Sequence, residues 1–134
     1  MKKLENLTRC LDSLRRCDAA LARRDEIYRV GVIGQFNLSF ELAWKAMQAV
    51  LTLHGVSEAA TGSPREIIKQ GYRVGFLGDE AIWLDMLKRR NTAVHVYNEA
   101  EADALAGRIL TDYLPAMERL RDSLSEKVTQ LESE

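Results

Sequence analysis

The residues best suited to chemistry lie in one short run, 88–97, with the sequence KRRNTAVHVY. Arg90 offers a permanent, planar charge that suits phosphate oxygens. His95 can accept or donate a proton near neutral pH. Together they can cleave a phosphodiester without a metal ion: His95 handles the proton of the 2′-hydroxyl or of the leaving group, and Arg90 stabilises the charge on the phosphoryl oxygens. Asn91 and Tyr97 add an amide and a phenol to the run.

Helical geometry restricts how these groups can meet. Asn91 and His95 are four residues apart and share a face if the helix continues. Arg90 and His95 are five apart, which turns them about 140° away from each other around a regular helix. Either the helix therefore ends between them, or two copies of the run meet across a two-fold axis and form a composite site.

The spacing alone also fits a purely structural role. Basic residues such as Lys88, Arg89 and Arg90 are ordinary in the last turn of a helix. A histidine and a tyrosine beyond them can fill a core or an interface. If the run is functional, Lys88 and Arg89 are the candidate phosphate- or RNA-binding residues beside Arg90.

Length and composition narrow the class of protein. The chain has 134 residues, 19 Lys+Arg against 20 Asp+Glu and a net charge of -1, with 46% hydrophobic and 29% charged residues. These values are typical of a single globular domain, residues 1–134, and argue against a globally basic nucleic-acid binder. No apolar run is long enough to cross a membrane and no signal peptide is recognisable, so we expect a cytoplasmic protein. Two histidines without a nearby ligand cluster predict neither a metal site nor a cofactor.

The first half of the chain follows a helical period. The first segment is expected to bury one stripe of leucines, which are Leu4, Leu7, Leu11, Leu14 and Leu21. A break is expected at 23–25, where Asp25 can cap the next helix. That helix is apolar on more than one side and should be central, with Ile27, Val30, Ile33, Phe36, Phe40, Trp44, Met47 and Leu51 at spacings of three and four. Gly31 and Gly34 inside it predict the close approach of another helix, and Gly55 should end it.

The second half carries clear helix-start signals. Residues 63–66 (SPRE) form a capping box with proline at the first helical position, and residues 98–101 (NEAE) form another. Asp79 should cap the helix between them. The last helix is expected to run through 105–131, with a kink at Pro115. No strand pattern is present, so we predict an all-α, up-and-down four-helix bundle with an additional short helix.

Three segments in this order resemble a known family. They are residues 40–45 (FELAWK), the capping box at 63–66 and residues 83–87 (WLDML), followed by Arg90, Asn91, His95 and Tyr97. The chain is similar to the nucleotidyltransferase substrate-binding protein family, which belongs to the HEPN superfamily and is related to the HepT toxins. The similarity extends from the second expected helix to about Tyr113.

The resemblance implies a small helical bundle that forms a homodimer and binds a minimal nucleotidyltransferase encoded nearby. Arg90, Asn91 and His95 match the HEPN signature, and Tyr97 matches the tyrosine that follows the histidine in HepT-like members. In those members the bundle is a metal-independent ribonuclease toxin, and the transferase silences it by adding AMP to the tyrosine. The resemblance thus assigns catalysis to Arg90 and His95, a supporting role to Asn91 and modification to Tyr97.

Three functions remain open at this point. The chain can be a substrate-binding subunit of the transferase, an active endoribonuclease, or a helical adaptor that only docks other chains. Residues 40–45 favour the first reading, and the complete Arg90-to-Tyr97 pattern favours a competent site. We interpret Phe40 and Trp44 as core residues and Glu41 with Lys45 as an i,i+4 pair that supports the helix.

Overall fold

The computed structural model describes residues 1–93 and 98–133, except for the side chains of 91–93. The described part is helical and contains no strand, which confirms the expected all-α class. Its elements are α1 (Lys2–Arg15), α2 (Ala19–Arg24), α3 (Glu26–Leu53), the 3-10 turn η1 (Ser57–Thr61), α4 (Pro64–Arg73), α5 (Glu80–Ala93), α6 (Glu99–Arg108), the π-helical turn η2 (Ile109–Tyr113) and α7 (Leu114–Glu132).

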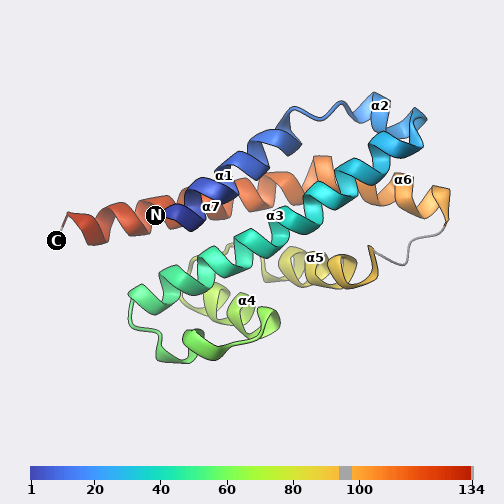
Figure 1. The fold of residues 1–134 in the computed structure, drawn as a ribbon. Helices are drawn as coiled ribbons and strands as arrows, with labels where there is room; N and C mark the ends of the chain where they lie inside the picture. The colour runs from blue at the N-terminus through green and yellow to red at the C-terminus, as the bar shows by residue number, and fades with distance from the viewer. Residues whose placement is uncertain (94–97, 134) are drawn as a thin grey trace.

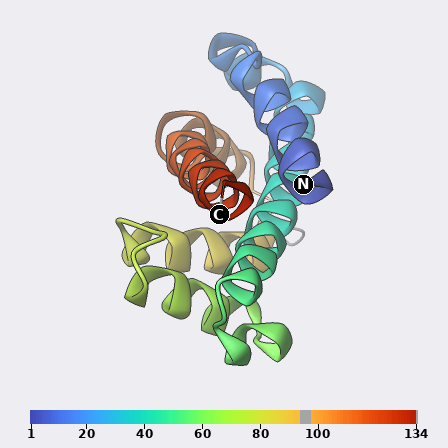
Figure 2. The same cartoon turned by 90° about the vertical axis from the view of Figure 1, so that its left-hand side faces the viewer.

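The long elements alternate in direction, as expected for an up-and-down bundle (Figure 1). Helix α3 runs through the middle. Helices α1 and α7 lie along one side of it, and α4 and α5 lie on the other (Figure 2). The helix α7 continues the line of α6, so the segment after residue 98 forms one long rod interrupted by η2.

An aromatic row fills the centre of the bundle. The rings of Phe36 and Phe40 on α3 are fully buried and stack with centroids 6.3 Å apart. Tyr113 stacks on Phe36 at 5.4 Å, and Trp83 of α5 meets Phe40 edge-on at 6.0 Å. Aromatic pairs of this kind add about 0.5–1.5 kcal/mol each to the burial of their surface. The row therefore ties the long rod and α5 to the same helix.

The first segment divides earlier than expected. Leu4, Leu7, Leu11 and Leu14 are buried as predicted, but α1 ends at Arg15. Asp18 then caps a separate short helix, α2, by accepting hydrogen bonds from the backbone N–H groups of residues 20 and 21. The stripe of leucines does not reveal this, because a capping aspartate can sit between two segments that share one apolar face.

Buried Arg29 on α3 secures the end of α2. Its Nε donates to the carbonyl of Ala22 at 2.9 Å, and its Nη2 donates to the carbonyl of Arg23 at 2.6 Å. Asp103 of α6 lies 3.8 Å from the same Nε. These contacts satisfy carbonyls that the end of a helix leaves open. Arg29 thus joins three helices through a charge that sequence reasoning did not single out.

Helix α3 is central, but one of its faces is uncovered. Ile27 is 84% exposed and Val30 61%, although their spacing had suggested burial, and Leu38 is 50% exposed. Gly31 and Gly34 lie on the same face, and a Cβ atom added to either would meet no described atom within 4 Å. No described helix of this chain approaches these glycines, so the predicted close approach of another helix stays a prediction.

The predicted helix ends are confirmed. Asp25, Ser63, Asp79 and Asn98 each accept a backbone N–H of the helix that follows. Gly55 adopts a φ of 86°, and the N–H groups of residues 55 and 56 donate to the last open carbonyls of α3. A left-handed residue at this position favours glycine.

The kink predicted at Pro115 stays a prediction, but the π-helical turn η2 ends two residues before this proline. Proline lacks an N–H and its ring crowds the carbonyl four residues earlier, so a widened turn at that point relieves both problems.

No helix in the described part of the chain has the length and apolar character needed to span a bilayer.

Candidate functional site

Helix α5 carries the basic end of the predicted site. Asp79 starts this helix, and Lys88, Arg89 and Arg90 lie near its last turn. Lys88 and Arg89 are exposed, whereas Arg90 is half-buried against α3. The three consecutive side chains therefore leave the helix in different directions, and each has different neighbours.

Arg90 is held by α3. Its Nη1 donates to the Glu41 carboxylate, and its guanidinium lies 5.8 Å from the centre of the Phe40 ring. Lys45 places its Nζ 3.6 Å from the other oxygen of Glu41. The Arg90 Nε is buried and has no hydrogen-bond partner among the described residues. Arg90 is thus oriented by a carboxylate and an aromatic ring, while some of its donors remain open.

Glu41 is a site residue that the sequence reasoning did not identify as one. Its spacing to Lys45 predicts a helix-stabilising pair, and that pair is present at 3.6 Å. The contact with Arg90 spans 49 positions and is invisible to local spacing. One signal was available: a carboxylate in the middle of a mostly apolar helix needs a cationic partner if it is to be partly buried.

A second charged group forms where α5 meets the rod. The Tyr113 hydroxyl donates to the Asp85 carboxylate, and the Arg108 Nη2 lies 3.2 Å from the same Asp85 oxygen. Arg108 also lies 3.5 Å from Asp112 and 5.5 Å from the centre of the Tyr113 ring. Arg89 of α5 lies close enough to the Tyr113 hydroxyl to act against the rise of its pKa. Arg89 and Arg90 therefore belong to two adjacent groups with separate carboxylates.

The remaining predicted site residues lie outside the described part. Asn91 belongs to α5 by its backbone, but its side chain is not described, and His95 and Tyr97 lie within 94–97. The meeting of Arg90 with His95 stays a prediction, as do the roles of Asn91 and Tyr97.

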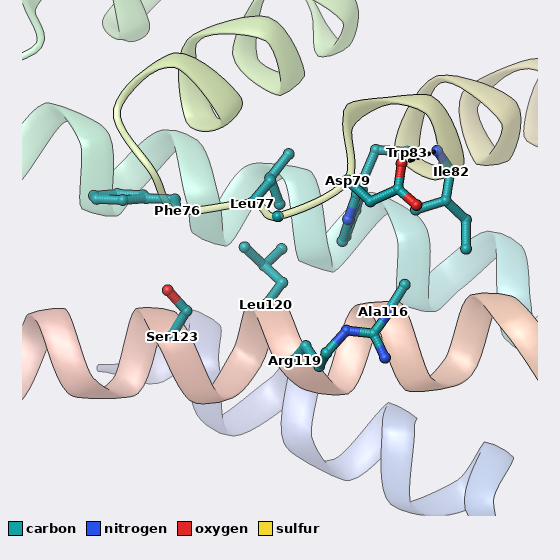
Figure 3. Close-up of a pocket in the computed structure, with 10 residues that line it drawn as sticks. Phe76, Leu77, Asp79, Ile82, Trp83, Ala116, Arg119, Leu120 and Ser123 are labelled. Carbon is teal, nitrogen blue, oxygen red and sulfur yellow. Dashed lines mark hydrogen bonds between the residues drawn. The ribbon is translucent and has the colours of Figure 1, made fainter.

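A cleft lies between the α4–α5 connection and α7, at the opposite end of α5 from Arg90 (Figure 3). Its volume is about 430 Å³. Its walls are mainly buried apolar side chains with an exposed arginine at the edge, and include Phe76, Leu77, Trp83, Leu120 and Arg119. The predicted site residues whose side chains are described, Lys88, Arg89 and Arg90, do not line it. Trp83 connects it to the aromatic row, since the same side chain meets Phe40.

No group of three or more His, Cys, Asp or Glu side chains arranged to hold a metal ion occurs among the described residues. The charged groups around Arg90 and Asp85 instead combine guanidinium donors with carboxylates that orient them. Such an arrangement suits the binding of phosphate oxygens.

A family model described as nucleotidyltransferase substrate binding protein like matches residues 2–126. The chain belongs to this family. The matched range includes both charged groups and the whole of α3.

A curated protein and a solved structure, both from Haemophilus influenzae, are similar to this family member. One, named "Probable ribonuclease HepT", is 26% identical over 99 residues, which are 72% of this chain and 67% of that protein. The other is the solved structure of HI0074, described as revealing the fold of a substrate binding domain of a nucleotidyltransferase. It aligns with a TM-score of 0.77 and 23% identity, and covers 91% of this chain and 98% of that one. The structural match establishes that the two proteins share a fold.

The Tyr113 hydroxyl of this family member should ionise at a higher pH than an ordinary tyrosine. Burial, and then the hydrogen bond to Asp85, raise the pKa of Tyr113 to about 12. An unfolded tyrosine ionises near pH 10. The stabilisation from neutral Tyr113 is therefore fully present below about pH 10 and is lost as the pH rises through the folded value. Tyrosinate absorbance should reveal one late-titrating tyrosine in the native protein.

Tyr113→Phe should remove the titration step at the highest pH. Tyr72→Phe, which changes an exposed tyrosine, should retain this late step. A late step that survives Tyr113→Phe would contradict the assignment.

Proposed function

We propose that this chain is the partner subunit of a minimal nucleotidyltransferase encoded nearby, and that it acts in the cytoplasm with a HEPN site formed by Arg90, Asn91, His95 and Tyr97. The observation that carries the proposal is the family match across residues 2–126. The orientation of Arg90 by Glu41 and Phe40 supports it, because an oriented guanidinium suits the binding of phosphate oxygens.

Tyr97 is the acceptor in this proposal. The transferase joins the α-phosphorus of ATP to the phenolic oxygen, the bond between the α- and β-phosphates breaks, and pyrophosphate leaves. The tyrosine proton passes to a base or to solvent. The product carries a phosphodiester with one negative charge, and Arg90, seven residues earlier, supplies the complementary guanidinium.

Co-expression with the neighbouring transferase tests this proposal. We expect the two chains to co-purify and the intact mass of this chain to rise by one or more adenylate groups. Peptide mapping should place the first group on Tyr97. Tyr97→Phe should abolish that modification, whereas the control variant Tyr72→Phe should retain it. The absence of both co-purification and added mass would refute the partner role. Co-purification without added mass would favour a substrate-binding subunit whose tyrosine is not modified.

A second candidate function is metal-independent endoribonuclease activity, which the relative named as a ribonuclease and the oriented guanidinium of Arg90 both favour. In this function the 2′-oxygen of RNA attacks the adjacent phosphorus and the 5′-oxygen leaves. His95 accepts the 2′-hydroxyl proton and a proton is returned to the leaving oxygen. Arg90 stabilises the charge on the non-bridging oxygens. The products are a 2′,3′-cyclic phosphate and a 5′-hydroxyl end.

Cleavage of a single-stranded RNA in the presence of a chelator tests the second function. Removing a preorganised donor to the developing charge costs about 100-fold or more in rate, so Arg90→Ala should reduce cleavage at least that much. Glu41→Gln should give a smaller loss, since Arg90 remains but its orientation weakens. Arg121→Ala, which removes an arginine paired with neighbouring Asp122 on α7, is the control. Equal rates in the Arg90 and Arg121 variants would rule out a catalytic Arg90.

We further propose that a second copy of this chain covers the open face of α3. The exposed side chains of Ile27, Val30 and Leu38 share this face with Gly31 and Gly34. Glycines with no neighbour allow another helix backbone to approach closely, and a two-fold axis lets one apolar patch bury itself against its own copy. Glu41 follows Leu38 by one turn, so a partner seated here lies beside the Arg90 site.

Gly31→Leu should prevent this association. The larger side chain separates the two backbones, while the loss of a helical glycine favours the folded monomer by about 1 kcal/mol. We expect sedimentation to report a dimer for the native chain and a folded monomer for the variant. Gly107→Leu, at an exposed glycine of α6 with no neighbour within 4 Å of a Cβ, should remain dimeric. A native chain that sediments as a monomer, or a dimer that survives Gly31→Leu, would overturn this proposal.

A further inference from the structure

The charged group around Asp85 is not explained by the roles assigned to Arg90, His95 and Tyr97. We propose that Arg108 and Arg89 form a second phosphate-binding subsite for single-stranded RNA, held in place by Asp85 and Tyr113. This inference rests on the proposed ribonuclease function and assigns a role to Arg108, which no sequence motif marks.

The π-helical turn creates the subsite. Arg108 and Tyr113 are five residues apart, and in a regular α-helix they would be turned about 140° from each other. They instead both contact Asp85, and the Arg108 guanidinium lies over the Tyr113 ring at 5.5 Å. The π-helical turn η2, Ile109–Tyr113, follows Arg108 directly, and its i→i+5 pattern brings residues five apart onto successive turns. Turns of this kind are rare inside helices and are often found at functional sites.

The Arg108 guanidinium is oriented by carboxylates and still has N–H donors for a further ligand. Its Nη2 faces Asp85 and its Nε faces Asp112, whereas no hydrogen bond within the described residues engages its Nη1. The side chain is 46% exposed. A guanidinium has five N–H donors in a fixed plane, so two can hold the carboxylates while others bind a phosphate.

The position of the subsite fits a continuous strand of RNA. Arg89 lies near Tyr113, and its neighbour Arg90 contacts Glu41 on α3. The two groups are therefore adjacent along the end of α5, as are successive phosphates along a strand. Backbone binding of this kind relies on arginine and lysine and needs no base contacts. A subsite beside Arg90 would hold a phosphate that is not cleaved and so fix the register of the one that is.

Salt dependence of RNA binding tests the subsite. The probe is a fluorescent single-stranded oligonucleotide, and His95→Ala serves as the background so that the probe stays intact. Each phosphate contact contributes about 0.7 to the slope of log affinity against log salt for a single strand. Arg108→Gln should lower the slope by about that amount. Arg121→Gln removes the same charge about 20 Å further along α7 and should leave the slope unchanged.

A variant that removes a negative charge distinguishes a phosphate-binding role of Arg108 from a purely structural one. Asp112→Asn removes a carboxylate that competes for Arg108, so it should tighten RNA binding relative to Asp122→Asn, an exposed aspartate of α7. A structural ion pair would give no such gain.

If Arg90→Gln weakens binding while the Arg108 and Asp112 variants match their controls, the subsite is wrong and the proposed function stands. If the His95→Ala background shows no salt-dependent binding of the probe, the subsite and the ribonuclease function fail together.

Discussion

The row of aromatic rings along α3 is the packing constraint that positions the neighbouring helices and the charged groups. Phe36 and Phe40 are completely buried, and Tyr113 and Trp83 extend the row into two other helices. A guanidinium rests near each end: Arg90 over Phe40 and Arg108 over Tyr113. The packed core therefore sets the positions of the two charges directly, and neither depends on a loop.

Two carboxylates also help to position the arginine side chains. Glu41 receives Arg90 and Lys45, and Asp85 receives Arg108 and the Tyr113 hydroxyl. A partly buried charge is costly unless it is paired, so each carboxylate and its partners hold one another in place. The result is two adjacent groups in which carboxylates hold guanidinium donors, on a chain whose net charge is -1.

Much of the fold could be read from the sequence, because helix periods and caps are local. The capping residues Asp25, Ser63 and Asn98 all begin helices as predicted. The exposure of Ile27 and Leu38 could not be read, since an apolar stripe looks the same whether its own chain or another one covers it. The pairs that build the charged groups join residues 49 and 28 positions apart, and no spacing rule reaches that far. Arg90 was found because it lies in a recognisable run, whereas Arg108 was not.

The π-helical turn affects how the sequences of relatives should be aligned. A turn of this type accommodates one additional residue while the helix continues on the same side of the bundle. Deletion of a residue within 109–112 would restore an α-helix in which the arginine and tyrosine stand four apart, again on a shared face. We therefore expect relatives to carry the pair at either spacing, with a one-residue indel between them. An ungapped alignment of α6 and α7 would hide this correspondence and make a shared feature look like divergence.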